Sequence, residues 1–156
     1  MDNFINIVLH EPEIPQNTGN IARLCACTGA RLILVGKLGF SMTSKYVKHS
    51  GLDYWDKVEI VRYLDYEEFL KTVSSGSNIY YLTTKGKKSL FDAKFKAGDY
   101  LVFGSESKGL PSRIMELNPE NHLRLPMKTE VRSLNLANTV SIATYEAIRQ
   151  IKPDLN

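Results

Sequence analysis

The chain has 156 residues, of which 43% are hydrophobic and 24% are charged. This length and composition fit one globular domain over residues 1–156, with a core large enough to need no disulfide or metal. They exclude disordered and fibrous proteins. The net charge of +3 is too small by itself to indicate a nucleic-acid partner.

We expect neither a signal peptide nor a membrane-spanning segment. The first residues lack the basic and apolar segments of a signal peptide, and no apolar run approaches the roughly 18 residues that span a bilayer. Cys25 and Cys27 are the two cysteines, and their spacing in a helical pattern points them apart, which disfavours a disulfide. We therefore expect reduced thiols, a cytoplasmic location and no membrane partner.

Apolar, β-branched segments alternate with helical patterns along the whole chain. Strands are predicted at residues 4–9, 31–35, 58–63, 79–83, 100–103 and 122–125. Helices are predicted at residues 20–28, 44–50, 66–73 and 135–151, with a short one after Pro111. This alternation predicts an α/β fold, a single domain whose mostly parallel sheet is covered by helices on both faces.

The last predicted helix is apolar around more than half of its circumference. One stripe faces the core, and further apolar residues widen it: Leu136, Val140, Ala143 and Ala147, then Ile142, Tyr145, Ile148 and Ile151. A surface helix usually carries one stripe, so the excess indicates either a homodimer interface or a helix well covered by its own domain.

Several common sites are absent from the sequence. The turn after the first strand lacks G-x-G-x-x-G, and Leu110 and Pro111 stand where a phosphate-binding loop needs Lys and Ser or Thr. The three histidines have no metal-ligand spacing, and G-x-S-x-G is missing. A conventional dinucleotide site, a phosphate-binding loop, a metal centre and a serine hydrolase are therefore disfavoured.

Three polar loops remain, each at the carboxyl end of a predicted strand, where open α/β sheets bind ligands. The first is residues 11–23, either a proline-stiffened capped loop or a phosphate or ribose cradle of Asn17, Asn20 and Arg23. The second, residues 103–111, is either a flexible connection or a binding loop in which Gly104 admits a ligand beside Glu106.

The third loop precedes the last helix. Ser133 is a candidate N-cap for that helix, whereas Asn135 and Asn138 are poor helix formers placed close to its first turn. Polar groups at those positions indicate either capping or ligand binding.

Together these loops resemble the three ordered motifs of SPOUT methyltransferases. The matching residues are Asn17, Gly19, Asn20 and Arg23, then Gly104, Glu106, Gly109, Leu110 and Pro111, then Leu125-Pro126-Met127 with Ser133-Leu134-Asn135. The resemblance covers about residues 7–150. The short chain and the segment EPEIPQNTGN at residues 11–20 are similar to the minimal branch that methylates the ribose 2′-oxygen of the tRNA wobble nucleotide.

The resemblance implies a deep trefoil knot in the C-terminal third and a bound S-adenosylmethionine (AdoMet), with no metal. The positions it implies for the cofactor are Leu82, Gly104, Leu125, Ser133 and Leu134. It implies a catalytic role for Arg23. Because a guanidinium stays protonated, we expect Arg23 to hold phosphate and to stabilise developing alkoxide charge. Asn17, Glu106 and Asn135, together with Ser133, would orient Arg23 and the ribose.

The RNA surface is expected to combine Arg23 and Tyr145 with a basic cluster. Lys85, Lys87 and Lys88 follow the cofactor strand, and Lys94, Lys96, Lys45 and Lys48 add further charge. With no appended RNA-binding domain, a homodimer would form the tRNA surface. The expected substrate is cytidine or modified uridine at the wobble position, in leucine tRNA isoacceptors. A different tRNA or rRNA position, a catalytically silent RNA-binding protein and a generic nucleotide-binding protein stay open.

Overall fold

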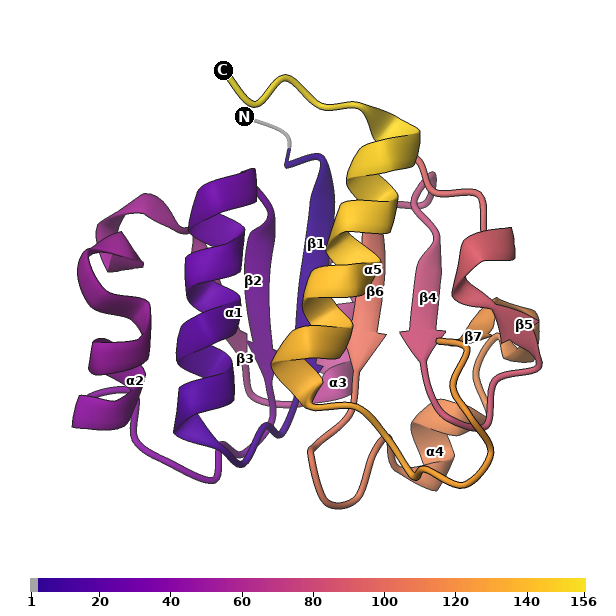
Figure 1. Ribbon diagram of the computed structural model, residues 1–156, viewed down its shortest axis with the longest axis horizontal. Coiled ribbons are helices and arrows are strands. Elements are labelled where there is room, and N and C mark those ends of the chain that lie inside the picture. Colours follow the sequence, from indigo (N-terminus) through magenta and orange to yellow (C-terminus); the bar gives the residue numbers. More distant parts are fainter. Residues whose placement is uncertain (1–2) are drawn as a thin grey trace.

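The computed structural model describes residues 3–156 and shows one seven-stranded sheet between helices (Figure 1). Every strand pair is parallel, and the strand order is β3-β2-β1-β6-β4-β7-β5. The strands are β1 Ile5–His10, β2 Arg31–Val35, β3 Ile60–Tyr63, β4 Ile79–Leu82, β5 Lys88–Ser89, β6 Asp99–Phe103 and β7 His122–Arg124. The predicted α/β class and parallel sheet are confirmed.

Helices cover both faces of the sheet, as predicted. They are α1 Pro15–Thr28, α2 Lys45–Gly51, α3 Tyr66–Leu70, α4 Ser112–Met115 and α5 Leu136–Ile151, with 3₁₀ turns at Leu52–Lys57, Leu90–Asp92 and Pro119–Asn121. Successive strand residues face opposite sides, so the core divides in two. Ile7 and Leu101 pack in the cluster of α1 and α5, whereas Val8 and Val102 pack in the cluster of α3 and α4.

The start of α1 differs from the prediction. The helix begins at Pro15, not at residue 20, so Asn17 lies in its first turn rather than in a loop. Proline suits a first helical position, but the N-cap residue Ile14 has no side chain that could cap the helix. The local sequence therefore lacks the usual signal for a helix start.

Other boundaries moved by a few residues. The helix predicted at 66–73 ends at Leu70, although its predicted N-cap is confirmed: Asp65 Oδ1 accepts a hydrogen bond from Glu68 N at 2.9 Å. The two-residue strand β5 was not predicted, because its Lys and Ser carry no apolar pattern. Within the described residues, no helix is long and apolar enough to cross a membrane.

The C-terminal half pairs its strands out of chain order. β7 lies between β4 and β5, so a strand late in the sequence is inserted between two strands that precede it in the sequence. The segments approach closely there: a Cβ on Gly86 would lie 2.6 Å from the carbonyl carbon of Leu123. The strand order does not describe the threading of the chain, so the trefoil knot stays a prediction.

The two cysteines lie on α1 and are not bonded to each other. Cys25 is on the buried face of α1 and Cys27 is on its exposed face. Burial raises the pKa of the Cys25 thiol, which makes it a packed core residue rather than a reactive group.

Candidate functional site

A pocket of about 740 Å³ opens at the carboxyl ends of β4 and β6, the lower edge of the sheet in Figure 1. Three chain segments form its walls: residues 82–85 after β4, residues 103–110 at the end of β6, and the segment from Leu125 into α5. Ile14, the N-cap residue of α1, Asn17 of α1 and Met115 of α4 complete the lining. The pocket therefore lies where the three polar loops of the sequence were expected to meet.

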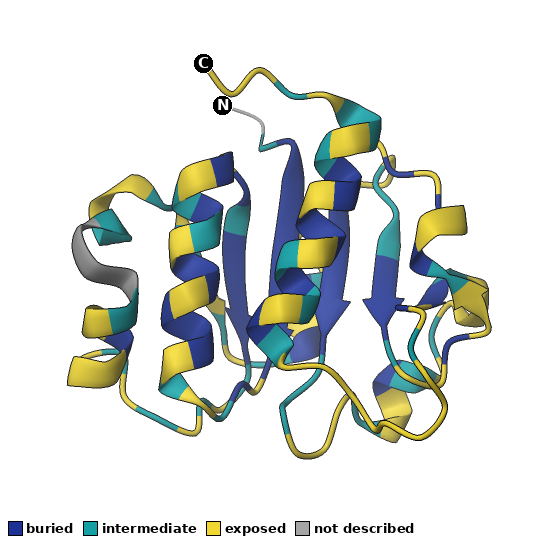
Figure 2. Cartoon of the chain, in the orientation of Figure 1, coloured by how far each residue is buried: buried dark blue, intermediate teal, exposed yellow. Residues whose placement is uncertain are grey.

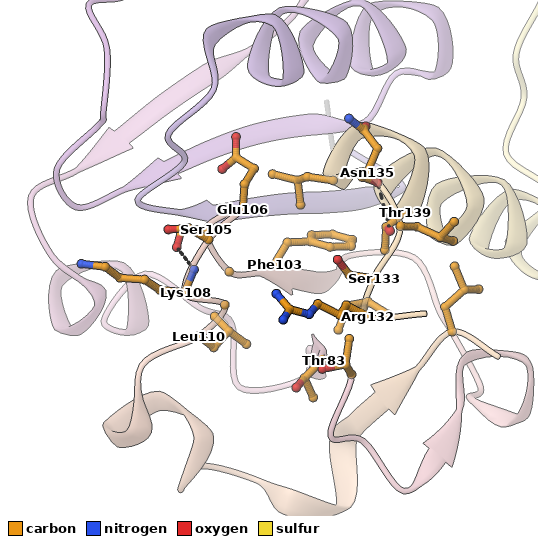
Figure 3. Close-up of a pocket in the computed structure, with 18 of the residues that line it drawn as sticks. Thr83, Phe103, Ser105, Glu106, Lys108, Leu110, Arg132, Ser133, Asn135 and Thr139 are labelled. Atoms are coloured by element: carbon orange, nitrogen blue, oxygen red, sulfur yellow. Dashed lines mark hydrogen bonds between the residues drawn. The ribbon is translucent and has the colours of Figure 1, made fainter. Parts of the chain in front are cut away.

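The floor of the pocket is apolar and its walls carry hydroxyl groups. Leu82, Phe103 and Leu125 are buried side chains that face it. Figure 3 shows Thr83, Ser133 and Thr139 around the same space. An apolar floor with a few polar groups at its rim is the usual lining of a small-molecule site.

Gly104 shapes the wall that follows β6. The chain turns back on itself there, with Ser105 and Gly109 forming a short antiparallel bridge (Gly109 N to Ser105 O, 2.9 Å). A Cβ on Gly104 would overlap the backbone of Gly109 and Leu110. Glycine at 104 is therefore required by the tight turn of the wall.

The Glu106 carboxylate joins this wall to α1. Its Oε1 accepts from the backbone N–H of Glu13 at 2.9 Å, and its Oε2 accepts from the N–H of Ile14 at 2.7 Å. Oε2 also accepts from Asn17 Nδ2 at 3.2 Å. Glu106 thus supplies the acceptor at the start of α1 that the local sequence lacks, and the positive end of the helix dipole favours its charge.

Asn17 extends the same network to the third segment. Its side chain is only 4% exposed, and its Oδ1 accepts from Asn135 Nδ2 at 3.1 Å. Asn135 Oδ1 in turn accepts from Asn138 N at 3.2 Å, which makes Asn135 the N-cap of α5. The suggestion that Ser133 caps this helix is wrong, because α5 begins two residues later than that cap requires.

A second carboxylate crosses the same junction in the opposite direction. Glu13 Oε1 accepts from Ser107 Oγ at 2.6 Å and from Ser107 N at 3.2 Å. These bonds, the side-chain one first, lower the pKa of the Glu13 carboxyl. Each of the two neighbouring segments therefore donates backbone N–H groups to a carboxylate of the other.

Positive charge gathers around the pocket. Lys85, Lys108 and Arg132 line it, and their side chains form no ion pair with any described residue. In Figure 3 the Arg132 guanidinium extends into the space between Phe103 and Leu110. Since the Glu106 oxygens are occupied by N–H donors, the free charges facing this space are cationic and suit an anionic group.

Most of the predicted site residues are brought together. The pocket is lined by Asn17, Leu82, Lys85, Gly104, Glu106, Leu125, Ser133, Leu134 and Asn135. Arg23 does not line it: the side chain is exposed on α1, with its guanidinium 5.0 Å from the centre of the Tyr54 ring. Tyr145, Lys87 and Lys88 also lie outside the lining, on exposed surface.

Sequence reasoning missed several groups at the site. Thr83, Phe103 and Arg132 line the pocket and Glu13 fixes its wall, yet none was predicted to act there. Glu13 and Arg132 fall inside the segments that carried the motifs, which was the available signal. Among the residues whose side chains the structure describes, 3–50 and 54–156, no group of three or more His, Cys, Asp or Glu is placed to hold a metal ion.

His10 ends β1 but stays outside the pocket. Its ring packs edge-on against Tyr66, with centroids 6.3 Å apart, in the core cluster of α3. Burial lowers the pKa of His10. The residue therefore belongs to the packing of the sheet rather than to the proton chemistry of the pocket.

A parallel α/β sheet whose carboxyl edge carries a pocket of mixed apolar and polar lining has the place and the groups of a small-molecule binding site. The model of the SpoU rRNA Methylase family matches residues 4–145. The chain belongs to this family, and the resemblance seen in its three motifs is confirmed.

The chain is also similar to individual RNA methyltransferases. The chain is 49% identical over 149 residues to a tRNA (cytidine(34)-2′-O)-methyltransferase of Aeromonas hydrophila, an alignment that covers 95% of each chain. It is 44% identical, with a TM-score of 0.90, to a protein solved in a study of 2-OH methylation of C/U34 on tRNA, covering 94% of this chain and 95% of that one. The methyltransferase AviRb of Streptomyces viridochromogenes, solved with AdoMet, has a TM-score of 0.86 and 25% identity over 96% of this chain and 58% of its own.

Proposed function

We propose that this protein transfers a methyl group from AdoMet to the ribose 2′-oxygen of the tRNA wobble nucleotide, cytidine 34 or a modified uridine 34. The observation that carries the proposal is the convergence of all three motif segments on one pocket, tied together by Glu106, Asn17 and Asn135. The relatives described above support the reaction and the position on tRNA.

The groups that line the pocket suit AdoMet. Leu82, Leu125 and Leu134 offer apolar surface for the adenine ring, and the tight turn at Gly104 lets the backbone face the ligand. The Ser133 hydroxyl is placed for the ribose or the base edge, and the nearby cations suit the carboxylate of the methionine part. Bound AdoMet supplies an electrophilic methyl group on a cationic sulfur.

The chain's own groups supply alignment. For transfer, the 2′-oxygen would bond to the methyl carbon while the carbon–sulfur bond breaks with its electron pair going to sulfur, and the hydroxyl proton would pass to solvent water. This reaction collapses charge and needs an aligned, water-poor site more than a strong base. Glu106, Asn17 and Asn135 hold the walls for that alignment. Arg23, which is exposed on α1 outside this pocket, would hold an RNA phosphate that flanks the target ribose.

Exposed cations extend the site toward RNA. Lys85 lines the pocket, and Lys87 and Lys88 follow it on exposed surface at the β5 edge. Such a strip suits the phosphates flanking the target ribose, and Tyr145 offers an exposed ring for a base. Leucine isoacceptors are the proposed substrates. A tRNA substrate and unpaired thiols fit the cytoplasm.

A homodimer is part of the proposal. Apolar side chains stay exposed beside the pocket and along α5: Ile14 and Leu134 are each 42% exposed, Ile142 is 39% and Tyr145 is 54%. Exposed apolar residues gathered in one region are typical of a protein interface. A sedimentation mass near twice 17.6 kDa is expected, and a mass near 17.6 kDa at working concentration would contradict the dimer.

The test is transfer of labelled methyl from AdoMet to total tRNA, followed by mapping of the labelled nucleoside. Label in 2′-O-methylcytidine or a 2′-O-methyluridine derivative at the wobble position is the expected result. Label elsewhere in tRNA, or in rRNA alone, would contradict the proposed position. The Arg23→Ala variant should lose turnover far more than AdoMet affinity, and a wild-type protein that binds RNA and AdoMet without any transfer would be a silent binder.

A further inference from the structure

The junction between α1 and the wall at residues 104–109 contains two carboxylates that cross each other. Glu106 accepts the N–H groups of Glu13 and Ile14, and Glu13 accepts the N–H and the hydroxyl of Ser107. The four bonds range from 2.6 to 3.2 Å, and they join residues 92 to 94 positions apart in the sequence.

The carboxylates of Glu106 and Glu13 make different contacts. Glu106 reaches both backbone N–H groups at the start of α1 and also Asn17, so it lies within the network at the pocket. Glu13 does not line the pocket, and its Oε1 accepts two hydrogen bonds from Ser107, the residue that follows Glu106. Glu13 therefore touches the wall from outside and restrains it next to the residue that the network uses.

This restraint has a direct geometric effect. With Ser107 held by Glu13, and with Ser105 bridged to Gly109, the turn that carries Glu106 is fixed on both sides. Without the Glu13 bonds, the turn would keep its internal bridge but lose its attachment on the Ser107 side. Displacement of a positioning group by about 1 Å can reduce a rate by about a hundredfold.

We propose that Glu13 is a positioning residue for methyl transfer: by binding Ser107, it holds the Glu106 turn against α1 and so sets the shape of the cofactor wall. This inference rests on the proposed function in that the wall serves AdoMet-dependent transfer. The role belongs chiefly to hydrogen-bond acceptance by the side chain, because both contacts are donated by the uncharged Ser107, although the charge of the carboxylate strengthens them.

The experiment compares Glu13→Ala, Glu13→Gln and Ser107→Ala with Glu120→Ala, an exposed glutamate whose side chain makes no hydrogen bond within the described residues. Each variant is measured for kcat and KM in methyl transfer, for AdoMet Kd by calorimetry and for melting temperature. Glu13→Ala should lower kcat/KM by about tenfold or more and weaken AdoMet binding, while its melting temperature stays close to that of the wild type.

The conservative variants separate positioning from bulk stability. Glu13→Gln keeps an oxygen acceptor and should recover most of the activity. Ser107→Ala keeps the backbone donor, so its kcat/KM should lie between those of the wild type and Glu13→Ala. Wild-type behaviour of Glu13→Ala, or a Glu13→Gln variant as poor as Glu13→Ala, would overturn the proposal.

A further readout works without any methyl transfer. Hydrogen exchange at the Ser107 amide of the unliganded protein should be faster in Glu13→Ala and unchanged in Glu120→Ala. If the wild type transfers no methyl, the proposed function fails while this exchange result still supports the restraint. If the exchange rate at Ser107 is unaffected by Glu13→Ala, the restraint itself fails.

Discussion

Two walls of one pocket differ sharply in how they are held. The wall at residues 104–109 carries its own bridge and is bound to α1 through Glu106 and Ser107. The opposite wall, residues 126–135, has one internal backbone bond, from Val131 N to Lys128 O at 3.3 Å. In burial the contrast is smaller: residues 128–135 before α5 are all exposed (Figure 2), whereas residues 104–106 of the other wall are half-buried and residues 107–109 are exposed.

This difference in hydrogen bonding indicates that the two walls have different roles in the site. Segments with few hydrogen bonds and little burial have low local stability, whereas a cross-linked wall is preorganised before a ligand arrives. We therefore expect the 104–109 wall to give the site its shape. The 126–135 segment, which carries Arg132, Ser133 and Leu134, should close over AdoMet and become ordered by it.

The largest expected effect comes from removing the acceptor of the fixed wall. Glu106→Ala leaves the N–H groups of Glu13 and Ile14 and the amide of Asn17 without their acceptor. We expect a loss of about 1–3 kcal/mol in the free energy of unfolding and a loss of methyl transfer of about a hundredfold. Urea unfolding and label transfer measure the two effects. Wild-type values in both would show that the wall is not held by Glu106.

A charge placed in the same network should act almost as strongly. Asn17→Asp puts a buried carboxylate beside Glu106 and should reduce stability more than Asn17→Ala, by about 2 kcal/mol or more relative to the wild type. Repulsion raises the pKa of the carboxylate pair, so protonation relieves it and the deficit should shrink as pH falls from 7 toward 5. Unfolding curves across that pH range check the sign, and a deficit that grows on acidification would contradict the contact.

An effect of similar size on stability is expected from the tight turn at Gly104. Gly104→Ala places a methyl group against the backbone of Gly109 and Leu110. The free energy of unfolding should fall by about 1–3 kcal/mol, and AdoMet affinity should also fall. Gly76→Ala is the matched control, because a Cβ there meets no atom within 4 Å. Equal melting temperatures and equal AdoMet Kd for the two variants would show that the 104–109 wall tolerates displacement.

The smallest effect on folding should come from the exposed wall. Ser133→Ala is expected to change the free energy of unfolding by less than about 0.5 kcal/mol, because the side chain is exposed and unbonded. AdoMet affinity should nevertheless fall several-fold through the lost hydroxyl. Calorimetry alongside urea unfolding tests the separation. A large loss of stability would mean that residues 126–135 are as firmly held as the opposite wall.

The sequence predicted what depends on local pattern. The buried strands appear as apolar runs, and the N-cap at Asp65 follows from its short-range geometry. The start of α1 could not be predicted, because its acceptor is Glu106, which is 92 residues away from Ile14. The cap of α5 was misplaced for a similar reason: Asn135 serves the helix and Asn17 together, a double role that only the folded chain reveals.

The candidate site followed the same rule. Motif order located most of the pocket lining, since each motif ends a strand of one parallel sheet. The motifs could not show that Arg23 lies outside the pocket or that Glu13 supports its wall. The position of Arg23 and the contact of Glu13 with Ser107 depend on how α1 and the residues just before it pack in the folded chain. Residue spacing carries no signal for that packing.

The most direct test of the two-wall account is hydrogen exchange with and without AdoMet. Without it, amides of residues 128–135 should exchange fast and those of 105–109 slowly. Saturating AdoMet should protect 128–135 strongly and change 105–109 little. Equal protection of both walls before AdoMet is added, or protection by AdoMet that bypasses residues 128–135, would contradict the account.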